Sequence, residues 1–202
     1  MIDNMSSKQI HLKLCLMGKG GVGKTSLINR YVHQRFLKKY MQTLGEDMFS
    51  KKITIGDNQI FVAIHDLAGQ EKFSPFRQTY LRGAQLGLAV FDLTLPNSLD
   101  ELKEQWIQDL SKTIDPKSKF YLSVVGNKTD LKRKVSEKSV KDLISYIGKH
   151  FSNFIVFEYI ETSAKENTNV EQSFFNLVNH FVEKNKRSLE KYSRLTYSSE
   201  ED

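Results

Sequence analysis

Residues 18–25 read G-K-G-G-V-G-K-T and directly follow an apolar run at residues 12–17. A loop of this type between a strand and a helix can hold phosphate groups, because glycines at positive φ let successive backbone N–H groups turn toward one anion. Lys24 adds a positive charge, and the Thr25 hydroxyl can ligate a Mg²⁺ ion that bridges two phosphates. The expected phosphate contacts are Gly20, Gly21, Val22, Gly23, Lys24, Thr25 and Ser26.

A second reactive group, Asp66, Gly69 and Gln70, follows a strand-like segment. The Asp66 carboxylate is suited to hold Mg²⁺, and Gly69 can bring its backbone N–H close to a terminal phosphate, where a side chain would obstruct. Gln70 can orient an attacking water molecule without changing its own charge. Thr43 could complete the metal site from a loop that closes over it, although alone it would be read as an ordinary loop threonine. The metal ligands predicted from these residues are Thr25 and Asp66, with Thr43 an open candidate, and the predicted catalytic residues are Gln70 and Lys24.

The sequence N-K-T-D at residues 127–130 follows a third strand-like segment. A guanine base presents its N1–H and 2-amino groups as adjacent donors, and the two oxygens of Asp130 match them, whereas adenine offers no such pair. Asn127 can tie this loop to the phosphate loop, and the aliphatic stem of Lys128 can lie over the base. These residues predict a guanine site.

A fourth motif, E-T-S-A-K at residues 161–165, follows the last strand-like segment. The backbone N–H of Ala164 can donate to the guanine O6, and Ser163 and Lys165 belong to the same site. Each short motif arises by chance and is weak alone. Their joint occurrence after successive strands, in one order and at the spacing of a domain, favours a single GTP/GDP site with Mg²⁺.

The remaining pattern alternates strands with helices. Strands are predicted at 10–17, 47–55, 59–65, 86–91, 120–125 and 154–160; helices are predicted at 24–34, 72–83, 98–114 (with Asn97 or Ser98 as N-cap), 136–150 and 169 to about 186. Such alternation indicates an α/β fold with a mostly parallel sheet and helices on both faces. Ligands bind at the carboxyl ends of the strands in such sheets, and every motif falls there.

Composition limits the function classes. The chain has 202 residues, 39% hydrophobic content and one cysteine, Cys15, which we expect to be a buried core residue. The net charge of +6 is spread along the chain, so we expect no nucleic-acid partner and only peripheral membrane contact or none. Because no apolar stretch is long enough to span a membrane and the N-terminus lacks a signal-peptide core, we expect a cytoplasmic protein.

Together these motifs resemble those of small GTPases of the Ras superfamily, and most closely the Rab-like branch. The resemblance covers residues 10–182 and includes D-L-A-G-Q-E-K-F at 66–73, Y-L-R-G-A at 80–84 and F-D-L-T at 91–94. It implies a single P-loop GTPase domain with a six-stranded sheet at residues 10–187. Residues 1–9 are expected to form a flexible N-terminus, and residues 188–202 a flexible acidic tail.

The resemblance also implies roles for individual residues and partners. Thr43 would be the threonine of the first switch loop on Mg²⁺, Gln70 would position water, and Phe36 would pack edgewise against the base. Gly20 would leave room for an arginine from a partner. The implied activity is a switch that engages effectors through two loops and hydrolyses GTP slowly without an activating partner. The implied partners are effectors, exchange factors and GTPase-activating proteins, with the chain itself a monomer.

The sequence departs from the Rab-like pattern in several places. Leu67 replaces a threonine, His65 replaces a tryptophan, and residues 42–48 resemble the first switch loop only loosely. Because this surface selects partners, individual partners cannot be transferred. No cysteine occurs near the C-terminus and the chain begins Met1-Ile2, so we expect neither prenylation nor N-myristoylation.

Two other functions stay open from the sequence. One is a nucleotide-loaded binding scaffold with negligible hydrolysis, which the intact set of reactive residues argues against. The other is a P-loop kinase, which would need a lid for its acceptor and would not need the motif at 127–130. The basic and apolar residues of segment 184–197 fit either a solvated helix end, which we favour, or an amphipathic membrane contact.

Overall fold

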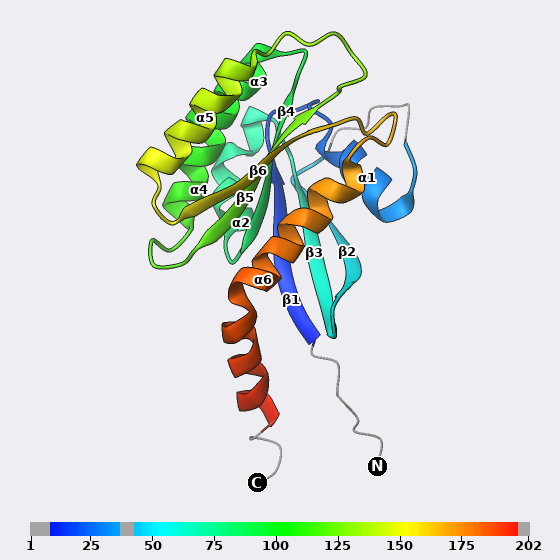
Figure 1. The fold of residues 1–202 in the computed structure, drawn as a ribbon. Helices are drawn as coiled ribbons and strands as arrows, with labels where there is room; N and C mark the ends of the chain where they lie inside the picture. Colours follow the sequence, from blue (N-terminus) through cyan, green and yellow to red (C-terminus); the bar gives the residue numbers. More distant parts are fainter. Residues whose placement is uncertain (1–8, 37–42, 198–202) are drawn as a thin grey trace.

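The computed structural model describes residues 9–36 and 43–197. Nearly all of the expected flexible N-terminus, the last part of the expected acidic tail and residues 37–42 of the first switch loop lie outside the described residues. The described chain forms one α/β fold with a central six-stranded sheet (Figure 1).

The sheet has the strand order β2-β3-β1-β4-β5-β6. Its strands are β1 (Gln9–Met17), β2 (Glu46–Ile55), β3 (Asn58–Leu67), β4 (Leu86–Asp92), β5 (Phe120–Asn127) and β6 (Phe154–Thr162). β2 pairs antiparallel with β3, and every other neighbouring pair is parallel. The strands predicted at 47–55 and 59–65 thus form a hairpin, and the predicted mostly parallel sheet is confirmed.

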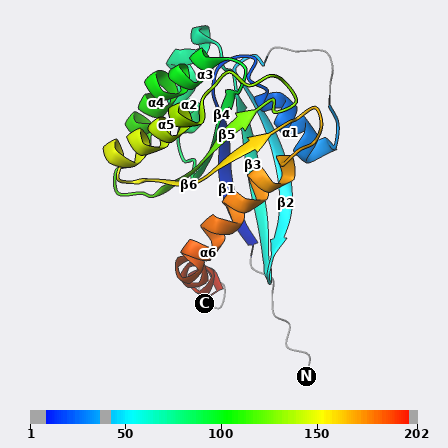
Figure 2. The same ribbon diagram turned by 45° about the horizontal axis from the view of Figure 1, so that its top comes forward.

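Helices cover both faces of the sheet (Figures 1 and 2). The helical elements are α1 (Lys24–His33), η1 (Glu71–Phe76), α2 (Arg77–Leu81), α3 (Pro96–Glu101), η2 (Leu102–Trp106), α4 (Ile107–Thr113), α5 (Glu137–His150) and α6 (Val170–Tyr197). α1 and α6 pack against one face, and α2 to α5 pack against the other. This arrangement gives two apolar cores, one on each side of the sheet.

β1 shows why the sequence folds into these layers. Leu12, Leu14 and Leu16 point into the core beneath α1 and α6, whereas Cys15 and Met17 point into the opposite core. From Leu14 to Met17 the strand is buried on both faces and every residue is apolar, whereas His11 and Lys13, nearer its start, are polar and at least partly exposed. Cys15 is fully buried as predicted, and burial raises the pKa of its thiol to about 12.

Two predicted helix boundaries are wrong. The helix expected at 98–114 begins at Pro96 with Leu95 as the N-cap residue, and it contains a π-helical turn at Leu102–Trp106. Proline suits the first helical turn because its missing N–H is not needed there. The Ser98 hydroxyl instead lies inside the turn and donates to the Leu95 carbonyl at 2.6 Å.

The last helix also differs from its predicted length. The apolar pattern predicts an end near residue 186, whereas α6 continues to Tyr197. Residues 187–197 contain neither glycine nor proline. The apolar stripe thins after Val182, although Leu189 still packs against the core, and the sequence supplies no signal that stops the helix.

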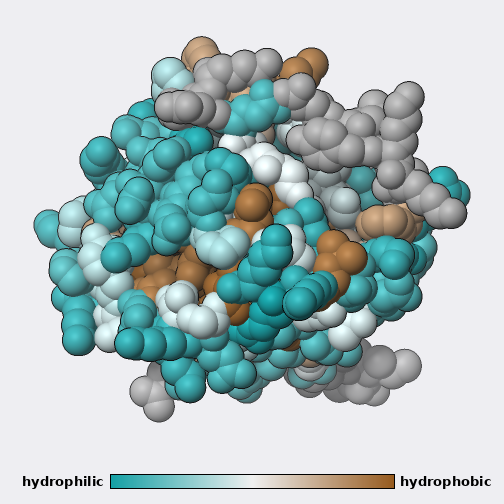
Figure 3. All heavy atoms as spheres, turned by 90° about the horizontal axis from the view of Figure 1, so that it is seen from above, coloured by the Kyte–Doolittle hydropathy of each residue, from teal (hydrophilic) through white to brown (hydrophobic). Residues whose placement is uncertain are grey.

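The carboxyl ends of β1, β3, β4, β5 and β6 lie at one edge of the sheet, at the top of Figure 1. Every sequence motif follows one of these strands. Seen from this edge, apolar residues are visible between surrounding hydrophilic ones (Figure 3). The fold thus gathers segments that are far apart in the sequence at a single surface.

Candidate active site

A cavity of about 440 Å³ opens at this edge. Its lining residues are Gly20, Gly21, Gly23, Lys24, Thr25, Ser26, Asn29, Phe36, Thr43, Gly69, Gln70, Asn127, Lys128, Asp130, Leu131, Ala164 and Lys165. Of the predicted site residues, Val22, Ser163 and Asp66 do not line it; they are buried and contact residues that do. All four sequence motifs therefore meet in one place.

Lys24 is the most enclosed cation of the cavity, with 5% of its surface exposed. Its Nζ donates to the Gly18 carbonyl at 2.7 Å and to the Lys19 carbonyl at 3.1 Å. Burial lowers the pKa of this ammonium to about 8, although the nearby carboxylates of Asp66 and Glu101 oppose the shift. An anion in the cavity would stabilise the charged form of Lys24.

Gly69 brings the segment after β3 into direct contact with the phosphate loop. The Gly20 N–H donates to the Gly69 carbonyl at 3.0 Å. A Cβ added at Gly69 would lie 2.4 Å from the Gly20 nitrogen, so any side chain there would push the two loops apart. At Gly20, by contrast, an added Cβ would meet Gln70 only at an ordinary contact distance of 3.6 Å.

The three predicted metal ligands converge beneath the cavity. The Thr25 and Thr43 hydroxyl oxygens are 3.0 Å apart, and both donate to Asp66 Oδ2. Asp66 is fully buried, its Oδ1 has no hydrogen-bond partner among the described residues, and burial raises its pKa. Hard oxygen donors with an uncompensated buried carboxylate suit Mg²⁺. The described residues contain no cluster of histidine, cysteine or acidic side chains that could hold another metal.

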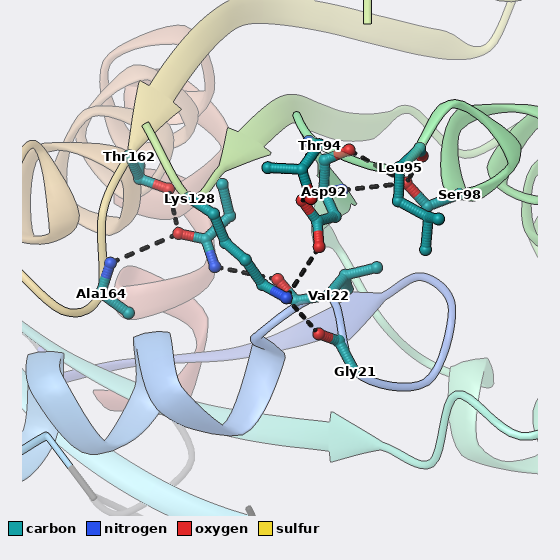
Figure 4. A network of polar contacts seen from close by, with 10 residues as sticks. Gly21, Val22, Asp92, Thr94, Leu95, Ser98, Lys128, Thr162 and Ala164 are labelled. Carbon is teal, nitrogen blue, oxygen red and sulfur yellow. Dashed lines mark hydrogen bonds and ion pairs between the residues drawn. The ribbon is translucent and has the colours of Figure 1, made fainter. Parts of the chain in front are cut away.

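Asn127 joins three segments of the site. Its Nδ2 donates to the Val22 carbonyl at 2.9 Å, and its Oδ1 accepts from the Thr162 hydroxyl at 3.1 Å and from the Ala164 N–H at 3.3 Å (Figure 4). The predicted tie between this loop and the phosphate loop is thus present in the structure. The Ala164 N–H, which we expect to meet the base, is here directed at Asn127.

Lys128 and Asp130 flank the place expected for the base. Lys128 Nζ donates to the Gly21 carbonyl at 2.8 Å and lies 2.7 Å from Asp92 Oδ2. Asp130 Oδ1 accepts from the Ser163 hydroxyl at 2.6 Å, which fixes the orientation of its carboxylate. A carboxylate held in this orientation can accept hydrogen bonds from the N1–H and 2-amino groups of guanine.

Phe36 lines another side of the cavity, and its ring lies against the guanidinium of Arg30. The Arg30 guanidinium lies 5.9 Å from the Phe36 ring centroid and donates to the Ala164 carbonyl at 3.0 Å and the Lys165 carbonyl at 2.9 Å. A side chain from α1 thereby links the aromatic wall to the loop after β6. This connection positions Phe36 relative to the base-side residues.

Four residues of the site were not predicted from the sequence: Asn29, Arg30, Asp92 and Leu131. Asn29 and Leu131 carried detectable signals, since Asn29 follows Thr25 by one helical turn and Leu131 directly follows the motif at 127–130. Asp92 ends a buried strand at the ligand edge, which is also a signal. Arg30 carried none, because the carbonyl groups of Ala164 and Lys165 that it contacts lie more than 130 residues away in the sequence.

The loop between β1 and α1, with a buried lysine and a hydroxyl and carboxylate cluster beside it, defines a nucleotide-binding protein of the P-loop class. The family model described as "Ras family" matches residues 13–183. Ras-related protein Rab7 of Glycine max is 38% identical over 169 residues, covering 81% of this chain and 78% of the relative. GTP-binding protein yptV5 of Volvox carteri is 38% identical over 176 residues, covering 84% and 82%.

A third relative, Ras-related protein Rab-7a of Paramecium octaurelia, is 36% identical over 173 residues, covering 84% of this chain and 80% of the relative. The chain belongs to the Ras family and resembles its Rab-like members over most of its length. It is a GTP-binding switch that uses Mg²⁺ and hydrolyses GTP to GDP. No helix among the described residues is long and apolar enough to cross a membrane.

Proposed function

We propose that the cavity binds GTP with Mg²⁺ in one orientation, with the phosphates at residues 18–26 and the base between Phe36, Lys128 and Asp130. The observation that carries this proposal is the convergence of Thr25, Thr43 and Asp66 beside the buried Lys24. The motif at 127–130 meets the same cavity from the other side. We assign the two ends of one nucleotide to these two parts of the cavity.

The residues of the chain divide the hydrolysis reaction among them. Gln70 orients water for in-line attack on the γ-phosphate, and Lys24 stabilises the negative charge that develops on the transferred phosphoryl group. The backbone N–H of Gly69 offers a further donor. Thr25, Thr43 and Asp66 would hold Mg²⁺, which when bound would supply electrostatic stabilisation of the phosphate oxygens.

A single-turnover measurement of GTP hydrolysis tests this assignment. We expect slow but definite hydrolysis by the wild type and a rate about a hundredfold lower for Gln70→Leu, because the attacking water loses its orientation. Gln78→Leu is the matched control, since Gln78 is exposed on α2. Equal rates for wild type and Gln70→Leu would refute the role of Gln70, and tight nucleotide retention without any hydrolysis would favour the scaffold alternative.

The cellular role is proposed from the relatives. Their names identify Rab7-type proteins, and we propose that this chain acts in membrane trafficking as a cytoplasmic monomer. Its partners would be effectors, exchange factors and GTPase-activating proteins, with peripheral membrane contact or none. Effector capture by the purified protein loaded with a non-hydrolysable GTP analogue, compared with GDP, tests the switch behaviour; equal capture in both states would contradict it.

The exposed surface near the first switch loop supports partner binding. Leu44 and Met48 are each 71% exposed, and Phe76 at the end of η1 is 54% exposed. In place of the tryptophan expected from the Rab-like pattern, His65 Nδ1 contacts Glu46 Oε1. This polar pair supports a partner set different from that of the Rab-like pattern, and effector selection by His65→Trp tests it.

A further inference from the structure

Asp92 is a buried acidic residue that the mechanism above does not use. It is the last residue of β4, is 4% exposed, and pairs in register with Asn127 at the end of β5. The parallel pairing of the two strands therefore places its carboxylate next to Lys128. A buried carboxylate at the ligand edge of a sheet needs an explanation, because burial without partners is costly.

Both carboxylate oxygens of Asp92 have partners (Figure 4). Oδ2 lies 2.7 Å from Lys128 Nζ, and Oδ1 accepts from the Thr94 N–H at 2.8 Å and from the Thr94 hydroxyl at 2.7 Å. Burial alone would raise the pKa of Asp92, but the bonds from Lys128 and Thr94 outweigh it and lower the pKa. The carboxylate is thus charged, and Thr94 fixes the direction in which it faces Lys128.

Lys128 is held at two points by this arrangement. Its Nζ contacts Asp92 and also donates to the Gly21 carbonyl at 2.8 Å, so the side chain spans from the loop after β5 to the phosphate loop. The side chain lines the cavity and is 31% exposed. A long lysine side chain would otherwise lose rotamer freedom when a nucleotide binds, and holding it in advance removes that cost.

We infer that Asp92 is a positioning residue that holds the Lys128 side chain over the nucleotide and thereby slows nucleotide release. This inference rests on the proposed binding mode, in which Lys128 covers the base. Asp92 itself does not line the cavity and acts only through Lys128. Thr94 in turn orients the Asp92 carboxylate through its N–H and hydroxyl groups.

A purely structural role is the competing explanation. The backbone of Asp92 also braces the turn before α3, because its N–H donates to Ser98 Oγ at 3.0 Å and its carbonyl accepts from the Leu95 N–H at 3.0 Å. These contacts use main-chain atoms and survive a change of the carboxylate. The two roles can therefore be separated by mutation.

The experiment measures the release rate of a fluorescent GDP analogue from full-length protein. Asp92→Asn keeps the shape of the side chain but removes its charge, and we expect release to become about tenfold faster, since a hydrogen bond to a charged group is lost. Asp100→Asn is the matched control, because Asp100 is exposed on the neighbouring α3 and the charge change is the same. We expect its release rate to stay within about twofold of the wild type.

A double-mutant cycle with Lys128→Met separates positioning from structure. If Asp92 acts through the Lys128 ammonium, Asp92→Asn should change release by less than about twofold once the ammonium is gone. A structural role predicts the same acceleration in both backgrounds, and that result would overturn the inference. Failure of both Asp92→Asn and Asp92→Ser to fold would also overturn it, because the carboxylate would then be a structural requirement.

The outcomes also distinguish this inference from the proposed function. If the wild type binds the analogue and guanine nucleotide displaces it, but Asp92→Asn releases it at the wild-type rate, only the role of Asp92 fails. If adenine nucleotide displaces the analogue as well as guanine nucleotide does, the base site itself is refuted. The positioning role of Asp92 falls with it.

Discussion

The two ends of the cavity differ in how completely their polar groups are paired. At the base end, the Asn127 amide and the Asp92 carboxylate have partners for each of their oxygens, and Ser163 orients Asp130. At the phosphate end, Asp66 Oδ1 is buried without a partner among the described residues, and Lys24 donates only to backbone carbonyls. One end is a preorganised set of hydrogen bonds, and the other holds incompletely compensated charge.

This difference indicates how binding free energy and specificity are divided. Buried charges gain most from a ligand of opposite charge, because the ligand replaces solvation that the protein has already lost. The phosphate end should therefore supply most of the affinity. The polar groups at the base end are already oriented, so binding there costs little reorganisation. Bases that would leave these fixed groups unpaired are rejected.

The most severe test of this division is Lys24→Ala. Removing one partner of a buried charged contact costs about 3–5 kcal/mol, so GDP and GTP affinity should fall by about two to four orders of magnitude. The preference for guanine over adenine should be unchanged. Equilibrium titration with both bases measures the two quantities, and exposed Lys141→Ala serves as the control. A loss of base preference in Lys24→Ala would break the comparison.

The converse test changes the base end. Asp130→Asn should weaken guanine binding by about 2 kcal/mol and favour xanthine, because the new amide complements the 2-oxo group of that base. Phosphate contacts should not change, so the ratio of GDP to GTP affinity should match the wild type. Competition between GDP and xanthosine diphosphate measures the preference, with exposed Asp142→Asn as control. Unchanged guanine preference would refute the assignment of Asp130.

Most of the phosphate end was predictable from the sequence, because backbone donors, a lysine and hydroxyls within one continuous loop leave a local signature. The base end was predictable only in part. Asn127, Lys128 and Asp130 form a motif, but the Asp92 contact with Lys128 depends on the parallel register of β4 and β5. Register is a property of the folded sheet and leaves no spacing in the sequence.

The fold shows the same division between local and distant information. Periodicity located every strand and each helical region, because apolar spacing is local. It missed Leu95 as the N-cap residue, whose side chain makes no capping hydrogen bond, and the π-helical turn at Leu102–Trp106. It also missed Arg30, whose partners lie on a loop that follows the last strand.

A smaller effect should distinguish the two nucleotide states at the phosphate end. Thr43→Ala removes a hydroxyl that we propose ligates Mg²⁺ only when the γ-phosphate holds the first switch loop, so GTP affinity should fall by about 1–2 kcal/mol. GDP affinity should change little. Thr43→Ser retains the hydroxyl and should restore GTP binding. Equal losses for GTP and GDP in titrations at saturating Mg²⁺ would remove Thr43 from the metal site.

The smallest expected effect concerns protons rather than affinity. The pKa of Lys24 is lowered from 10.5 to about 8 by burial, and a bound phosphate would raise it again. Well below pH 8 the Lys24 ammonium is already charged, so nucleotide binding is accompanied by little proton uptake. The uptake is about 0.1 proton per nucleotide at pH 7 and rises to about 0.9 at pH 9. Nucleotide affinity should accordingly fall as the pH rises above about 8.

Calorimetry in two buffers of different ionisation enthalpy measures this uptake at each pH. Lys24→Arg keeps a permanent charge, so whatever binding it retains should show no rise in uptake between pH 7 and pH 9. The Asp92 carboxylate at the base end adds no protons in this range, since its pKa is lowered and it stays charged. If wild type and Lys24→Arg took up equal numbers of protons, Lys24 would already be fully charged before nucleotide binds. The proposed difference in charge compensation between the phosphate end and the base end would then be wrong.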